Sequence, residues 1–167
     1  LRSAFETPPK ILLPTLFCGQ TESTMRQHGL KTAFYPIDSE MNPQIEGLQE
    51  VIRIEKPDAV LVCDYFGWSA SNFDELKDLF WREHLFSIRD CCHNPHSYNR
   101  GESDFDAVIF SWRKCYPVGF GGGLLWEKGN PNKEHEYQSA HSLQQLFSSG
   151  LRRWFVGAAK KFLPLAL

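Results

Sequence analysis

The stretch of residues 109–125, IFSWRKCYPVGFGGGLL, contains the side chains best suited to chemistry. Ser111 ends an apolar run and Lys114 follows three residues later, so a hydroxyl and an ammonium can face the same ligand. Glycines at 119 and 121–123 permit a close approach of the backbone to that ligand. The stretch is compatible with a phosphate-binding turn, although its lysine precedes the glycines, which reverses the P-loop order. Alternatively, the lysine amine can react with the aldehyde of a cofactor.

An acidic side chain provides the second half of a possible site. Asp90, within SIRDCCH, lies two residues after the end of the expected strand 85–88. The 23 residues between Asp90 and Lys114 are enough for a crossover connection that brings both to one edge of a parallel sheet. We therefore expect a carboxylate and an amine to share one cleft.

The elements that must position these groups follow from the apolar pattern. Residues 21–28, residues 45–55 and the segment after Asn72 have the composition and spacing of helices. Strands that alternate with such helices predict an α/β fold, a three-layer α/β/α domain with a mostly parallel sheet. The last strand follows a short connection, so we expect it at an antiparallel edge. The expected strands are residues 11–13, 33–37, 59–63, 85–88, 107–110 and 122–126.

Open parallel sheets bind their ligands beyond the carboxyl ends of the strands. The candidate site residues are therefore those in the segments just after each expected strand. These segments are residues 14–19, Asp38, residues 64–68, residues 90–93 and residues 111–114.

Composition restricts the class of protein and its partners. The 167 residues are 42% hydrophobic and 23% charged, which indicates a globular chain with a core rather than a disordered one. The formal net charge is -2, so we expect no nucleic-acid and no membrane partner. Five cysteines without a CxxC pair, and no signal peptide or membrane span, favour a reducing cytoplasm.

The end of the sequence reads as a different unit from the rest. Residues 1–130 are expected to form most of an α/β domain, and residues 131–167 a polar linker and a long helix over about 137–163, ended by Pro164. The basic side chains of this helix are interpreted as its solvated face, with a membrane-surface or oligomer contact as the alternatives. Because the chain begins with Leu and almost immediately with a strand, we expect a fragment of a longer protein.

Taken together, the motifs resemble the pyridoxal phosphate (PLP) enzymes of fold type I, and more narrowly the DegT/DnrJ/StrS family of sugar aminotransferases. The resemblance covers residues 11–127 through LLPT, FYPID, DYFG, RDCCH and SWRK, which are similar in order and spacing to the family's VPS, FxDID, HxYG, EDAAQ/H and lysine segments. The fold it implies is an incomplete PLP-dependent transferase large domain. The long helix would then lead toward a small domain that this sequence does not contain.

The resemblance assigns roles to five side chains. Asp90 would pair with the pyridine nitrogen, and Lys114 would hold the cofactor and act as general base and acid. Ser111 would bind the cofactor phosphate and His93 would lie near the ring's 3-oxygen, while Phe17 is the candidate for the aromatic ring above the cofactor. Simpler roles are a turn cap for Asp90, an exposed charge for Lys114, a backbone hydrogen bond for His93 and core packing for Phe17.

The function implied is transfer of an amino group from an amino acid such as glutamate to a keto sugar, in a homodimer. A noncatalytic remnant of the fold and another PLP enzyme such as a lyase are the alternatives, because the family's phosphate-binding helix start does not occur in this sequence. A dehydratase of the family would carry His in place of Lys114. A zinc site of Cys91, Cys92, His93 and His96 is disfavoured, because adjacent cysteines at a strand end point in opposite directions.

Overall fold

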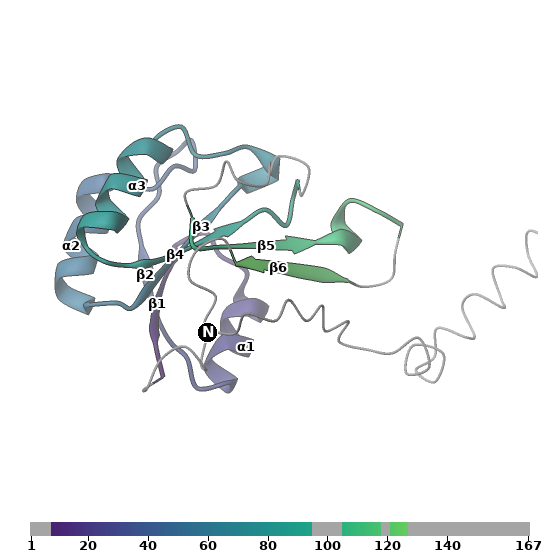
Figure 1. The fold of residues 1–167 in the computed structure, drawn as a ribbon, viewed down its shortest axis with the longest axis horizontal. Coiled ribbons are helices and arrows are strands. Elements are labelled where there is room, and N and C mark those ends of the chain that lie inside the picture. Colours follow the sequence, from purple (N-terminus) through teal and green to yellow (C-terminus); the bar gives the residue numbers. More distant parts are fainter. Residues whose placement is uncertain (1–7, 95–104, 118–120, 127–167) are drawn as a thin grey trace, which may run out of the picture. The chain divides into compact units, whose positions relative to one another are not determined.

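The computed structural model describes residues 8–94, 105–117 and 121–126. They form a six-stranded sheet in the order β2-β1-β3-β4-β5-β6, in which every neighbouring pair is parallel except β5 with β6 (Figure 1). The expected α/β fold with a mostly parallel sheet and an antiparallel edge is therefore confirmed. The elements are β1 Lys10–Pro14, α1 Gly19–Gln27, β2 Lys31–Tyr35, α2 Ile45–Glu55, β3 Ala59–Cys63, α3 Phe73–Arg82, β4 Phe86–Asp90, β5 Ala107–Ser111 and β6 Gly122–Trp126.

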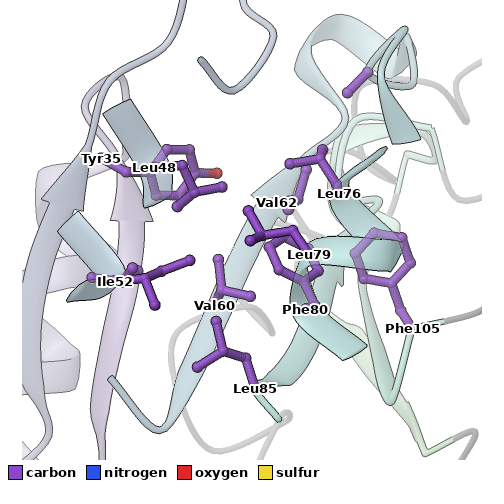
Figure 2. Close-up of a cluster of buried hydrophobic side chains, with 12 residues drawn as sticks. Tyr35, Leu48, Ile52, Val60, Val62, Leu76, Leu79, Phe80, Leu85 and Phe105 are labelled. Atoms are coloured by element: carbon purple, nitrogen blue, oxygen red, sulfur yellow. The ribbon is translucent and has the colours of Figure 1, made fainter. Parts of the chain in front are cut away.

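Helices cover both faces of the sheet, with α2 and α3 on one face and α1 on the other (Figure 1). Side chains alternate between these faces along each strand. One set of strand residues packs beneath α2 and α3 in the larger core, which Figure 2 shows around Val60, Val62, Leu76 and Leu79. The alternate set forms a second core on the α1 side, made of Ile11, Leu13, Ala59, Leu61 and Ile88. The three expected layers are thus present.

Strand boundaries differ from the sequence prediction by up to two residues. The second strand was predicted over 33–37, but β2 covers Lys31–Tyr35. Pro36 follows and has no N–H for a ladder, and Ile37 forms only an isolated bridge with Pro43. Similarly, β4 extends to Asp90, so the predicted site acid is the last residue of its strand rather than the first of a loop.

The start of α3 shows how tertiary contacts replace a local cap. Asn72 occupies the N-cap position, but its side chain makes no capping hydrogen bond. Its Nδ2 donates instead to the carbonyl of Pro43 at 2.8 Å. This bond ties the start of α3 to the loop before α2.

The linker and the long helix predicted over residues 131–167 lie outside the described residues. In the part of the chain that the structure describes, no helix is both long enough and apolar enough to cross a membrane.

Candidate functional site

A cavity of about 310 Å³ opens at the carboxyl ends of the strands. This volume lies at the lower end of the range of small-molecule sites, roughly 300–1,000 Å³. Four segments contribute to it: the ends of β1, β3 and β4 with the residues after them, and the turn after β5. Its lining residues are Leu16, Phe17, Cys18, Cys63, Asp64, Tyr65, Phe66, Asp90, His93 and Lys114.

The order of the strands explains why the cavity lies there. From β1 the chain passes through α1 to β2 on one side, and from β2 it passes through α2 to β3 on the other side. The two connections leave on opposite faces, so β1 and β3 flank the point where the strand order reverses. Open α/β sheets bind ligands in the crevice at such a switch point.

Asp90 enters this cavity from the end of β4. Asp90 is two residues after Ile88 in β4, so its side chain lies on the same face of the sheet as that of Ile88, the α1 face. Oδ1 accepts the backbone N–H of Cys92 at 2.9 Å, so the turn-capping role is present. The Asp90 carboxylate makes no ion pair with any of the described residues. Its charge therefore remains able to pair with a cation in the cavity.

Lys114 reaches the cavity from the single turn of 3-10 helix, Trp112–Lys114, that follows β5. Like Asp90, it forms no ion pair with a described residue, so the two opposite charges line one cavity without pairing with each other. Hydrogen bonds from Thr21 and, to a smaller extent, the charge of Lys114 lower the pKa of Cys18. Burial and Asp90 raise the pKa of Cys92 to about 12, while Lys114 opposes that rise.

His93 is held by the loop that follows β3. Its Nδ1 accepts the backbone N–H of Phe66 at 3.1 Å, and the two rings stack with centroids 5.9 Å apart. Accepting at Nδ1 places the proton of a neutral imidazole on Nε2, which can donate to a ligand. Gly67 permits this packing, because its φ is +88° and a Cβ there would lie 2.7 Å from the Cβ of Asn94.

The other two predicted residues occupy different positions. Phe17 lines the cavity and also packs on the α1-side core, so both of its predicted roles are compatible with the structure. Ser111 is the last residue of β5, opposite Gly122 on β6, and is not among the residues that line the cavity. Its role in binding a phosphate stays a prediction.

Four lining residues had no individual role in the sequence prediction, namely Leu16, Cys18, Cys63 and Asp64. Tyr65 and Phe66 belong to segment 64–68, which was expected to line or cover the cleft. Burial raises the pKa of Cys63 and of Tyr65, so both remain protonated at neutral pH. Tyr65 donates its hydroxyl hydrogen bond to the carbonyl of Leu16 and joins the ends of β3 and β1. The signal in the sequence was the pair of segments 14–19 and 64–68 after the strands, which contain Cys18 and Tyr65.

Asp38, which was also a candidate because it follows an expected strand, lies away from the cavity. It follows β2, the edge strand, and its Oδ1 accepts the N–H groups of Glu40 and Asn42 at 2.8 and 2.9 Å. It therefore caps an exposed turn and does not line the cavity. No group of three or more potential metal ligands lies together within the described ranges, which do not include His96.

No protein-family model matches the sequence, and no curated protein is similar to it in sequence. Solved structures do share its fold. The chain aligns with PseC of Helicobacter pylori, an aminotransferase involved in pseudoaminic acid biosynthesis, at a TM-score of 0.62 and 19% identity over 75% of this chain and 34% of PseC. For DesI, solved with its TDP-sugar product, the values are 0.61, 20%, 73% and 32%.

A third structure is the GDP-4-keto-6-deoxy-D-mannose-3-dehydratase of E. coli with bound hydrated PLP, at a TM-score of 0.58 and 21% identity over 75% of this chain and 33% of the dehydratase. The chain spans about a third of the length of each of these proteins. We conclude that the described part of this chain has the α/β fold of part of PseC, DesI and this dehydratase.

Proposed function

We propose that the cavity binds PLP and that the chain serves in amino transfer from an amino acid such as glutamate to a keto sugar. The observation that carries this proposal is the cavity itself. It brings together Asp90 at the end of β4 and Lys114 in the turn after β5, with Phe17 and His93 in the same lining, and neither charge forms an ion pair with a described residue.

The donor set of the cavity fits this cofactor. A carboxylate without an ion pair suits a protonated pyridine nitrogen, and a primary amine suits an aldehyde. The aromatic ring of Phe17 can cover a flat ring, and Nε2 of His93 can donate to an oxygen. The volume of about 310 Å³ is within the range that encloses small organic ligands.

Bound PLP supplies an electron-accepting ring that stabilises the carbon left after an α-proton is removed. In that setting Asp90 keeps the proton on the ring nitrogen, because its carboxylate favours the cation. Lys114 would hold the aldehyde through Nζ, and its free amine would act as general base and acid for the proton of the donor carbon.

The keto-sugar substrate is supported by the solved structures with this fold, which include the aminotransferase PseC and DesI with a TDP-sugar. We further propose a homodimer working in the cytoplasm, with the active site at the subunit boundary. The exposed Phe66 and Leu16 at the mouth of the cavity, 72% and 54% accessible, would suit such coverage. The competing proposal is a module of this fold that binds the cofactor or a partner without turnover.

An absorption titration of the purified chain with PLP tests the proposal. We expect the visible band of a lysine-bound cofactor, absent in Lys114→Ala and retained in Lys31→Ala, which removes an exposed lysine of β2 away from the cavity. Borohydride reduction followed by peptide mass spectrometry should place the adduct on Lys114. Bleaching of the band by glutamate supports transamination, whereas a band that ignores all amino donors supports the binding module. A wild-type protein without a band refutes both.

A further inference from the structure

We propose that Asp64 is a positioning residue that holds the end of β4 so that Asp90 faces the cavity. This inference rests on the proposed function, because it concerns how the cofactor's acid is presented. Asp64 is the residue after β3, and its side chain has no accessible surface. Asp64 contacts the last two residues of β4, Arg89 and Asp90, and also Cys91, which directly follows the strand.

The strongest of these contacts is the ion pair with Arg89. Nη2 of Arg89 donates to Oδ2 of Asp64 at 2.9 Å, and Nε lies 3.2 Å from both carboxylate oxygens. The guanidinium is fixed further by Ser69, whose Oγ accepts from Nη2 at 2.6 Å, and by the ring of Phe73, 4.7 Å from Cζ. Only 11% of the Arg89 side chain is accessible. A guanidinium with this many partners has a single orientation available.

Two further contacts hold the neighbouring backbone. The N–H of Asp64 donates to the carbonyl of Asp90 at 2.9 Å. The thiol of Cys91 donates to Oδ2 of Asp64 at 3.4 Å, and Cys91 is fully buried. Residues on both sides of Asp90, and its own carbonyl, are therefore attached to one buried side chain and its peptide.

Because side chains alternate between the two faces of a strand, the contacts of Asp64 with the neighbours of Asp90 also fix the direction of the Asp90 side chain. Arg89 packs on Phe73 of α3, so it lies on the face opposite to Asp90. Turning the Asp90 carboxylate away from the cavity would rotate the neighbouring residues and break the contacts with Asp64. The contacts of Asp64 thus fix the face of the sheet on which the Asp90 carboxylate lies.

Stability alone does not account for this arrangement. Burying an ion pair carries a desolvation penalty, and apolar replacements of such pairs are often neutral or stabilising. A bare Asp64 beside Asp90 would also place two carboxylates near each other, which favours protonation of one of them. Arg89 therefore both holds Asp64 in place and compensates its negative charge next to the site.

The test compares Asp64→Asn with Asp106→Asn in PLP binding by the full chain. Asp106 is a matched control, because its Oδ2 holds the other end of β4 by accepting the N–H and the hydroxyl of Ser87, both at 2.8 Å. We expect Asp64→Asn to weaken PLP binding by about tenfold, as loss of an outer-shell partner does at metal sites. The pH dependence of the visible band should shift as well. Asp106→Asn should change neither, although urea unfolding should show a loss of stability in both.

Arg89→Lys provides a second variant if Asp64→Asn fails to fold, because it keeps the charge and loses the forked contact. It should show a smaller loss of affinity in the same direction. Wild-type affinity and an unchanged pH profile in folded Asp64→Asn or Arg89→Lys would overturn the positioning role while leaving the proposed function intact. A wild-type chain that binds no PLP would overturn both.

Discussion

The hydroxyl of Tyr35 occupies a place in the sheet where a backbone donor is missing. The N–H of Thr15 donates to the carbonyl of Tyr35 on β2 at 2.9 Å. Successive N–H groups of a strand point to opposite sides, so an N–H at the residue before Thr15 would point toward β3. That residue is Pro14, which has no N–H. If the register of Ile11 with Ala59 and Leu12 with Val60 is continued along the strands, the nitrogen of Pro14 falls next to the carbonyl of Leu61. The Tyr35 hydroxyl donates to this carbonyl instead, at 2.9 Å in a fully buried position.

Tyr35→Phe should therefore destabilise the fold by more than the loss of an ordinary hydroxyl. The ring remains, so no large cavity forms, but the buried carbonyl of Leu61 loses this donor. Leaving a buried acceptor unsatisfied costs about 1–3 kcal/mol. With a urea dependence of about 1–3 kcal/mol/M, typical of small domains, the midpoint of unfolding should fall by about 1 M.

The assay is urea unfolding of the full chain, followed by tryptophan fluorescence, with Pro14→Val as the partner variant. Valine restores a backbone N–H in a strand, so the double variant Pro14→Val/Tyr35→Phe should recover part of the stability that Tyr35→Phe loses. A midpoint for Tyr35→Phe equal to that of the wild type would refute the reasoning. So would a double variant less stable than the sum of the two single changes predicts.

Three further predictions concern the cavity and its surroundings. Gly67→Ala should cost at least about 1 kcal/mol in urea unfolding, because its φ is +88° and a Cβ would clash with Asn94; unchanged stability would contradict this. Cys18, exposed and with a lowered pKa, should react with iodoacetamide faster than Cys63, whose pKa burial raises; equal rates in peptide mapping would count against the cavity geometry. Burial raises the folded-state pKa of Cys63 and of Cys92, the latter to about 12. The contribution of these thiols to stability is fully present below the unfolded thiol pKa of about 8.5, so the free energy of unfolding should decline as pH rises from there toward the folded pKa. Cys63→Val should lessen this decline.

The pattern of apolar residues along the sequence was sufficient to predict the helices and strands, because each depends mainly on residues that are neighbours in the sequence. The apolar run Ala59–Cys63 and the periodicity over Ile45–Glu55 match β3 and α2 to the residue. The boundary of β2 was less predictable, since Pro36 and the bridge from Ile37 to Pro43 decide where pairing stops.

The sequence by itself determined that reactive residues follow the strands, because the carboxyl ends of parallel strands meet at one edge. Only the tertiary structure decided which of them meet, because strand order is set by contacts between distant residues. It placed β1 between β2 and β3, which separates Asp38 from the cavity and brings Phe17 to it. It also paired Asp64 with Arg89, 25 residues away, and left Asp90 and Lys114 without ion pairs among the described residues. Spacing along the sequence determines the face of a strand on which a side chain lies and the edge of the sheet that it follows. Burial and charge compensation depend instead on residues that are distant in the sequence and become neighbours only in the folded chain.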